Sequence, residues 1–205
     1  MLVLSASAAK KSSKKWAAVE ATVVDQKGNP VEDAIVFTLD GTSSRKAKTI
    51  VMVMKDMDFA PKFVAVTVGD SVSFPNRDTT HHHVYSFSKI KKFDSRLYKD
   101  GKPKVVKFNK AGLVKAGCKI HDWMKGTILI TTSDRRVFTD AGGVAVLKVA
   151  RGKSVRLGIY HPRLRGKHTK HEVDVALRKG KGTASWKLKL KKKKKKKSTR
   201  NKVYY

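Results

Sequence analysis

Apolar and polar residues alternate along most of the chain, which is the pattern of half-buried β-strands. Near the start, Val19, Ala21 and Val23 alternate with polar residues, and a dense turn signal follows at residues 25–30. Helical periodicity longer than two turns is absent from the sequence, so it predicts an all-β protein built as sandwiches. Runs rich in β-branched and aromatic residues predict further strands at 34–37, 63–68, 72–74, 82–87, 105–108, 127–132, 144–149 and 155–159.

The last part of the chain predicts a hairpin. Residues 173–177 alternate apolar side chains with charged or small ones, and residues 186–190 alternate apolar side chains with lysines. A glycine-lysine-glycine turn at 180–182 separates the two runs. We therefore expect two strands that pair side by side and turn their lysines toward solvent.

Composition narrows the possible classes of protein. The 205 residues carry 47 Lys and Arg against 16 Asp and Glu, a formal charge of +31, yet 40% of them are apolar. That apolar content excludes a fully disordered polycation. The longest apolar runs are strand-sized, far short of the roughly 20 residues that a membrane span needs. A single cysteine, Cys118, excludes an internal disulfide, and the length fits one large or two small domains.

The candidate chemistry lies in the segment 117–126. Cys118, His121 and Met124 offer a thiolate, an imidazole and a thioether at intervals of three residues. Two imidazoles and one thiolate in a plane, with a weak axial thioether, form the blue-copper arrangement. The three histidines at 81–83, in a segment that follows a predicted strand, can supply the second imidazole. Two such loops at one end of a sandwich predict a single metal site.

At these residues the sequence resembles the cupredoxins. It is most similar to cupredoxin-type methylamine utilization proteins and more distantly to the amicyanins and plastocyanins. In that pattern the first copper histidine lies six residues after an asparagine, so Asn76 selects His82 over His81 and His83. The resemblance implies a Greek-key sandwich over about residues 50–132, with one copper ion held by residues that match the family's ligands: His82, Cys118, His121 and Met124.

The ligand loop departs from the amicyanin pattern in one respect. Amicyanin-like loops place prolines around the ligand histidine, whereas Ile120 and Asp122 stand beside His121. Gly126 matches the glycine that opens the last strand, and the runs at 57–61 and 66–74 fit the upstream strands. The loop's stiffness and its exposed surface are therefore expected to differ from those of amicyanin.

The segments on either side resemble a carboxypeptidase-regulatory-like β-sandwich. The run 24–36 looks like its opening, and the run 138–147 looks like its later strands. We therefore expect the copper domain to be inserted between two parts of a second, smaller sandwich. The predicted domain bounds are a signal-peptide remnant or basic leader at 1–15, the first part of that sandwich at 16–47, the cupredoxin domain at 48–132, its second part at 133–190 and a disordered lysine-rich tail at 191–205.

Other interpretations of the same residues remain open. Zinc could bind two imidazoles and a thiolate, although an axial thioether has little value to zinc. Cys118 could be a small buried hydrophobe, Met124 a core residue and His121 a surface histidine. The methionines at 52, 54 and 57 could capture Cu(I), or fill a core. The histidines at 161, 168 and 171 are interpreted as solvated, with a second metal site as the alternative.

These residues predict one-electron transfer by a mononuclear copper site. The chain offers neither a nucleophile with base and acid partners nor a glycine-rich phosphate loop, so the sequence does not predict an enzyme. A copper carrier or store would use the same ligands. A polyanion-binding module on a cupredoxin scaffold is a third possibility. Aromatic residues are not interleaved with the lysine run, so specific nucleic-acid recognition is not expected.

The distribution of charge predicts an acidic redox partner. Removing the tail's nine cations would leave +22, so the folded part is itself basic. Residues 89–110 hold nine cations against two acids, and they join the two copper loops. Trp123, beside His121, could belong to a docking patch. The lysine tail allows nonspecific contact with polyanions or anionic surfaces. The first nine residues end in small side chains like a signal-peptidase site, which together with the resemblance predicts export, to the periplasm or beyond.

Overall fold

The structure, a computed structural model, describes residues 15–99 and 101–192. Within them the chain is all-β, as predicted: strands β1 to β17 are accompanied by one short 3₁₀ helix, η1 (His168–His171). None of the described helical segments is long and apolar enough to cross a membrane. The signal-like start, at residues 1–9, and the tail from residue 193 onward lie outside the described residues.

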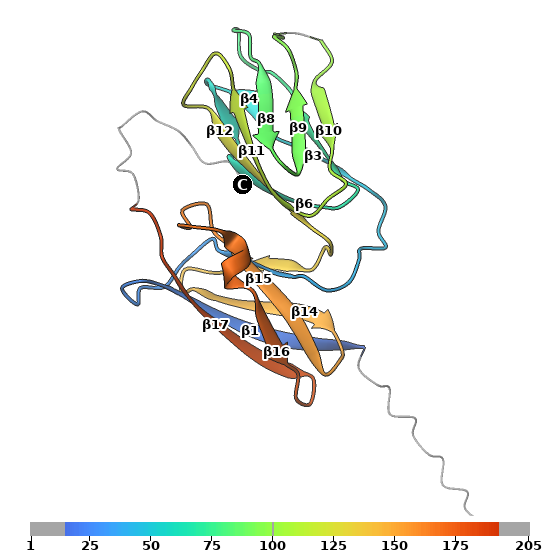
Figure 1. Cartoon of the computed structure of the whole chain (residues 1–205), viewed down its shortest axis with the longest axis vertical. Helices are drawn as coiled ribbons and strands as arrows, with labels where there is room; N and C mark the ends of the chain where they lie inside the picture. Colours follow the sequence, from blue (N-terminus) through green and yellow to red (C-terminus); the bar gives the residue numbers. More distant parts are fainter. Residues whose placement is uncertain (1–14, 100, 193–205) are drawn as a thin grey trace, which may run out of the picture.

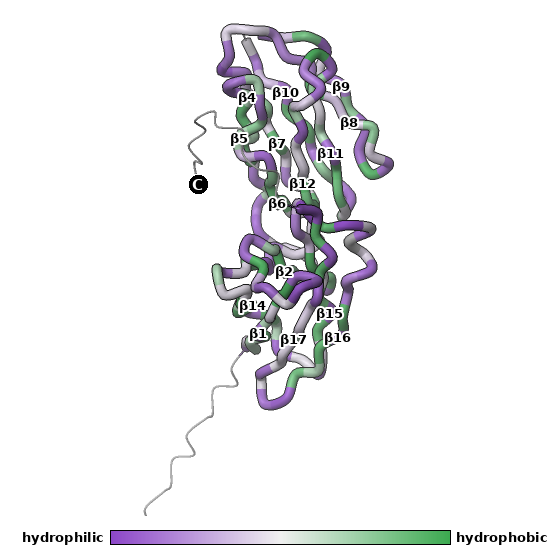
Figure 2. Tube along the Cα trace, turned by 90° about the vertical axis from the view of Figure 1, so that its left-hand side faces the viewer, coloured by the Kyte–Doolittle hydropathy of each residue, from purple (hydrophilic) through white to green (hydrophobic). Residues whose placement is uncertain are grey.

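The strands form two lobes that follow one another along the molecule's longest axis (Figure 1). The central lobe contains β3 to β12, and the flanking lobe contains β1, β2 and β13 to β17. Tyr160 joins the lobes, because its ring stacks on Phe63 at 5.4 Å and its hydroxyl accepts a hydrogen bond from Lys115 Nζ at 3.0 Å. Figure 2 shows that hydrophobic stretches concentrate on the strands of both lobes, while many of the connecting turns are hydrophilic.

The central lobe packs two sheets and a small ribbon around one hydrophobic cluster. Its centre contains Phe59, Phe74, Phe108 and Ile128, all buried. The larger sheet has the order β6 (Phe63–Thr67), β12 (Lys125–Thr131), β11 (Gly112–Cys118), β8 (Val84–Ser88) and β9 (Lys91–Asp94). The smaller sheet and the ribbon are β10 (Lys104–Lys107), β7 (Ser71–Phe74) and β3 (Thr49–Val51), then β4 (Val53–Lys55) and β5 (Asp58–Ala60).

The flanking lobe is one sandwich drawn from both ends of the described chain. Its apolar faces meet in a second hydrophobic cluster, where Val19, Ala21 and Val23 of the first strand are buried. The first sheet has the order β14 (Val144–Ala150), β1 (Trp16–Asp25) and β17 (Lys181–Leu188). The second has the order β13 (Arg136–Phe138), β2 (Ile35–Thr38), β15 (Ser154–Tyr160) and β16 (Val173–Ala176). The likeness to a carboxypeptidase-regulatory-like sandwich and the domain bounds above stay predictions.

The predicted C-terminal hairpin is wrong. β16 and β17 lie in different sheets: β16 pairs with β15, while β17 pairs in parallel with β1 from Ala18 opposite Lys181 onward. The turn between them closes on a single bridge between Arg178 and Lys181. Each strand has one apolar face, and those faces bury against each other across the sandwich. Two strands that follow one another in the sequence, each with one apolar face, can lie in facing sheets as well as pair within one sheet. The alternation of apolar and polar residues alone does not distinguish these two arrangements.

A buried carboxylate, that of Asp70, fixes the segment that enters the central lobe. It accepts hydrogen bonds from both terminal nitrogens of Arg45 and from the backbone N–H groups of Lys48 and Thr67, the latter two both at 2.8 Å. Burial raises the pKa of the Asp70 carboxyl, but these hydrogen bonds outweigh burial and hold that pKa below its ordinary value. A depressed pKa adds stability above the unfolded-state value of about 4, and this stability is lost as the pH falls through the folded-state value.

Replacing Asp70 with alanine is therefore expected to lower the free energy of unfolding by about 3 kcal/mol at pH 7, since it leaves Arg45 and two N–H groups without their acceptor. The deficit should shrink as the pH falls below about 4, where the carboxyl of the unfolded chain is protonated, and it should vanish once the pH is also below the depressed folded-state pKa. Urea denaturation at pH 7 and pH 3 measures both. The control is Asp134→Ala, because Asp134 lies 3.9 Å from Arg45 Nε and is exposed, so its loss should cost about 0.5 kcal/mol or less. Equal deficits for Asp70→Ala at the two pH values would contradict this account.

Candidate metal centre

Two loops meet at one end of the central lobe. The first joins β7 to β8 and carries the three histidines, and the second joins β11 to β12. β8 and β11 are neighbours in the larger sheet, with Cys118 opposite Val84. His82 lies two residues before Val84, so this pairing brings its imidazole next to the Cys118 thiol. His121 then returns to the same point because the second loop is short, closed by a hydrogen bond from Met124 N–H to the His121 carbonyl at 3.0 Å.

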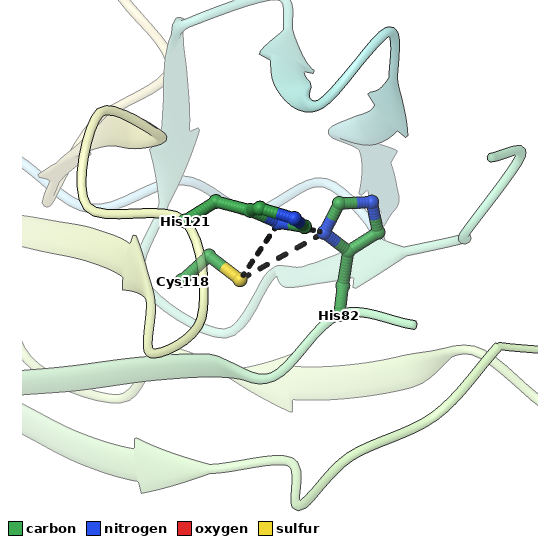
Figure 3. A group of neighbouring side chains, drawn as sticks. All are labelled: His82, Cys118 and His121. Carbon is green, nitrogen blue, oxygen red and sulfur yellow. Dashed lines mark hydrogen bonds between the residues drawn. The ribbon is translucent and has the colours of Figure 1, made fainter. Parts of the chain in front are cut away.

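Three donor atoms face one another at this point (Figure 3). Cys118 Sγ lies 3.7 Å from His82 Nδ1 and 3.7 Å from His121 Nδ1, and the two nitrogens lie 3.2 Å apart. A point in their plane that is equally distant from all three lies about 2 Å from each, which is close to the length of metal–imidazole and metal–thiolate bonds. The chemistry and the spacing of these three donors therefore fit one metal ion.

The site is closed toward the protein and open on one side. His82 and Cys118 are buried, whereas His121 is partly exposed. Met124 is buried in the same hydrophobic cluster as Cys118, and its carbonyl accepts a hydrogen bond from Cys118 N–H at 3.4 Å. The thioether of Met124 and the thiol of Cys118 are thus parts of one apolar wall, and only the His121 side reaches solvent.

The remote nitrogen of His82 fixes the tautomer of the ring. His82 Nε2 lies 2.7 Å from Asp78 Oδ2, where it donates its proton to a carboxylate. Donation from Nε2 leaves the lone pair on Nδ1, which is the atom that faces the other donors. Burial raises the pKa of the Asp78 carboxyl, but hydrogen bonds from His82 and from two backbone N–H groups outweigh burial and keep that pKa below its ordinary value. Asp78 is therefore an anion at neutral pH.

Asn76 explains physically why an asparagine precedes the ligand by six residues. Its side-chain Oδ1 accepts a hydrogen bond from Asp78 N–H at 2.9 Å, and its Nδ2 donates to the carbonyls of Thr80 at 2.8 Å and Tyr98 at 3.2 Å. The loop is thereby wrapped around one amide side chain. That wrapping orients Asp78 toward His82.

The other histidines and methionines lie outside the donor cluster. His81 is exposed, and His83 Nε2 lies 2.5 Å from Asp94 Oδ1. Met52 and Met54 are buried in the central core, which favours the gap-filling interpretation for these two, while Met57 is exposed. The interpretation of His161 as solvated is wrong, because its ring is buried and its Nδ1 accepts a hydrogen bond from Arg163 N–H. Among the described residues the metal-compatible group is the one formed by His82, Cys118 and His121.

The surface beside His121 is apolar. Trp123 is 61% exposed, Ile120 is also exposed, and the Trp123 ring lies 5.3 Å from the His121 ring. Ile120 and Asp122, the positions where amicyanin-like loops carry prolines, both face solvent. Trp123 is held in place by a hydrogen bond from its Nε1 to the Met57 carbonyl at 2.9 Å. This fixed indole therefore stands next to the one exposed side of the cluster.

Comparisons with known proteins bear on the fold only. Neither the protein-family models nor the curated proteins contain a match to this chain. Among solved structures, the chain is similar to a mutant of reduced amicyanin, with 20% identity and a TM-score of 0.38 over 48% of this chain and 99% of that one. It is similar to a purple cupredoxin from Nitrosopumilus maritimus, with 20% identity and a TM-score of 0.35 over 42% of this chain and 100% of that one.

A third similarity is to a copper-containing nitrite reductase from Thermus scotoductus, with 22% identity and a TM-score of 0.39. That alignment covers 54% of this chain and 28% of the reductase, so this chain spans much less than the whole enzyme. Similarity to cupredoxin structures thus extends over about half of the chain. The likeness to methylamine utilization proteins stays a prediction.

Two features of the site were missed at the sequence level. β11, which carries Cys118 at its end, was not expected, because Gly112 and Gly117 interrupt its apolar pattern. A Cβ at Gly117 would lie 3.1 Å from the Tyr85 ring, so a larger residue there would require that ring to shift by a few tenths of an ångström. Asp78 was also missed, although its position four residues before His82 is a spacing from which a carboxylate can reach an imidazole.

Proposed function

We propose that this protein binds one copper ion through His82, Cys118, His121 and Met124, and passes single electrons between protein partners. The observation that carries the proposal is the triangle of one sulfur and two imidazole nitrogens, whose equidistant point lies about 2 Å from each atom. Bound copper would supply a one-electron couple between Cu(I) and Cu(II). Met124 would supply a fourth, weaker ligand through its thioether.

The residues around the cluster suit electron transfer more than substrate chemistry. Cys118 ends β11, and the buried His82 is fixed in its loop by hydrogen bonds to Tyr98 and Asp78, so little movement is needed when the charge of the site changes. His121 is the ligand nearest to solvent, and electrons are proposed to enter and leave through it. The apolar surface at Ile120 and Trp123 would give a partner a small, dry contact area around that exit.

The test is optical and electrochemical. The protein loaded with one equivalent of Cu(II) should show an intense visible band from thiolate-to-copper charge transfer, and should be reduced and reoxidised reversibly by one electron per copper. A control titration with Zn(II) gives no such band and measures competition for the same ligands. A colourless Cu(II) complex would contradict the blue-copper assignment.

A copper carrier would use the same ligands, so the two functions differ in how fast the metal leaves. His82 and Cys118 are buried, so an acceptor could approach the ion only from the side of the partly exposed His121 unless the 75–83 or 119–124 loop opens. That burial favours electron transfer. We expect a competing chelator to remove Cu(I) slowly, over hours, whereas a carrier would release its copper within seconds to minutes when a chelator or an acceptor is added.

The proposed partner is an acidic protein. Lys91 and Lys92 on β9 and Lys104 and Lys107 on β10 line a groove of about 300 Å³ between these two edge strands. Asp94 in this groove is already paired with Lys119 at 2.7 Å, so the net charge offered to a partner is positive. Complementary charge accelerates diffusional encounter. Export to the periplasm or beyond remains part of the proposal, as does nonspecific contact of the lysine tail with polyanions.

Electron exchange with an acidic partner is expected to slow as salt rises. The bimolecular rate constant should fall roughly tenfold or more between 10 mM and 300 mM NaCl, because the Debye length shrinks from about 30 Å to about 6 Å over that range. Stopped-flow reduction of the copper-loaded protein by an acidic cupredoxin or cytochrome measures it. Reversing the charge at Lys92 and Lys107 should weaken the salt dependence, while the same change at Lys148 and Lys187 of the flanking lobe is the matched control. A rate that does not depend on salt would remove this part of the proposal.

A further inference from the structure

The hairpin turn between β4 and β5 has a backbone that its own sequence does not favour. Asp56 and Met57 form a two-residue loop, with Lys55 paired to Asp58, and their φ values are +55° and +51°. Two successive residues with positive φ are ordinarily asparagine and glycine. A side chain in this region costs roughly 1 kcal/mol or more, so the turn persists only where its surroundings hold it.

Asp78 holds the turn on one side. Its carboxylate accepts hydrogen bonds from Asp56 N–H at 2.6 Å and from Met57 N–H at 3.0 Å. The same Oδ2 atom that receives the Met57 N–H also receives His82 Nε2–H. One carboxylate thus joins the first histidine loop to a turn more than 20 residues away in sequence.

Trp123 holds the turn on the other side. Its Nε1–H donates to the Met57 carbonyl at 2.9 Å, and its ring lies 5.3 Å from that of His121. Trp123 is 61% exposed and Met57 is 46% exposed, so burial alone does not fix this indole. The connected residues form a closed path that runs from His82 through Asp78, the turn and Trp123 to His121, and returns to His82 across the two donor nitrogens.

We infer that the turn at residues 56–57 is a strut that fixes both histidine-bearing loops before the metal binds, with Asp78 and Trp123 as positioning residues. Neither Asp78 nor Trp123 belongs to the group of donor atoms that could bind the metal. Asp78 sets the tautomer and the direction of the His82 ring, and Trp123 sets the position of the loop that carries His121. The inference rests on the proposed function for its effect on copper, but the strut itself is a property of the protein without metal.

Asparagine cannot replace Asp78 in this role. Three N–H donors converge on the two carboxylate oxygens, and an asparagine offers one oxygen and one further N–H₂ donor. If the oxygen stays with His82 and Met57, the amide nitrogen faces the Asp56 N–H. If the amide flips, the nitrogen faces His82 Nε2 and favours the tautomer with its proton on Nδ1, where copper would bind. Either arrangement weakens the strut.

The decisive experiment needs no copper. In the metal-free protein, hydrogen exchange of the Trp123 indole N–H is followed by NMR in the wild type and in Asp78→Asn. We expect the variant to exchange several-fold faster at Trp123, although Asp78 does not touch Trp123. The indole N–H of Trp186, which donates to the His171 carbonyl at 2.9 Å in the flanking lobe, should not change and is the internal control. Unchanged exchange at Trp123 would overturn the strut.

Copper measurements then test the consequence for the site. Asp78→Asn should keep the thiolate-to-copper band, but bind Cu(II) roughly 10- to 100-fold more weakly. If the affinity for Cu(I) is unchanged, each tenfold loss of Cu(II) affinity raises the reduction potential by about 59 mV. The matched control is Asp94→Asn, which removes the same charge from a carboxylate paired with the non-ligand His83, and should leave the potential nearly unchanged.

Trp123→Phe removes the indole N–H at the exposed end of the strut. Because Trp123 is exposed, this change is not expected to affect folding. It should also lower the Cu(II) affinity, and the double variant should lose little more than Asp78→Asn alone, because both act through one turn. If the loss of Cu(II) affinity in the double variant equals the product of the two single losses, the two residues act independently and the inference is overturned. If the wild type lacks the copper band, the proposed function fails while the metal-free exchange experiment still decides on the strut.

Discussion

Replacing Cys118 with alanine is expected to abolish the visible copper band entirely. The band arises from charge transfer between thiolate and copper, and the one cysteine of the chain lies 3.7 Å from the donor nitrogens of both His82 and His121. Cu(II) affinity should fall by more than the roughly 10- to 100-fold that is lost when a group supporting a ligand is removed. Absorption spectroscopy and a competitive Cu(II) titration measure the two effects.

The fold should survive this change, because alanine is slightly smaller than cysteine and suits the apolar wall at the end of β11, so the free energy of unfolding should fall by about 1 kcal/mol. The matched control is His83→Ala. His83 stands beside His82 in sequence but contacts Asp94, so its loss should leave the band intact. If Cys118→Ala keeps an intense band, or if His83→Ala loses it, the ligand assignment is wrong.

Replacing Phe74 with alanine is expected to lower the free energy of unfolding of the central lobe by about 3–5 kcal/mol. Phe74 is fully buried, with its ring 6.2 Å from that of Phe59 and 5.8 Å from that of Phe93. It ends β7 directly before the histidine loop, and its carbonyl accepts a hydrogen bond from the Tyr98 hydroxyl at 2.5 Å. The cavity should therefore also loosen His82 and speed the loss of copper to a chelator.

Denaturant unfolding followed by the copper band reports on the central lobe, while tryptophan fluorescence reports on both lobes, since Trp16 and Trp186 lie in the flanking one. Two separate transitions are expected in the variant, because only one lobe is weakened. Phe87→Ala is the control: this ring is 72% exposed, and its loss should change the free energy of unfolding by about 0.5 kcal/mol or less. Equal effects of the two substitutions would contradict the assigned core.

The sequence allowed the all-β class and most strands to be predicted, because strands such as β1 and β14 keep strict alternation of buried and exposed positions. Two of the three donors that the structure brings together, Cys118 and His121, were predictable for a different reason, since the interval between them is local, while His82 was selected only by its resemblance to a family pattern. What could not be predicted depends on contacts between distant segments. The pairing of β17 with β1, the glycine-interrupted strand β11 and the link between Asp78 and the 56–57 turn are each decided by a neighbour that the local pattern does not contain.

The parallel pairing of β1 with β17 has a consequence for biosynthesis. Among the described strands β1 leaves the ribosome first, but β17, which pairs with it from Ala18 opposite Lys181 to Asp25 opposite Leu188, is made last. Pairings of such long sequence separation form slowly. The central lobe, whose strands are contiguous in the chain, can fold while the flanking sandwich still lacks its last strand. During synthesis the metal site can therefore be complete while β1 still exposes an open edge, so a nascent chain stalled before residue 181 is the form in which this protein is most prone to aggregate.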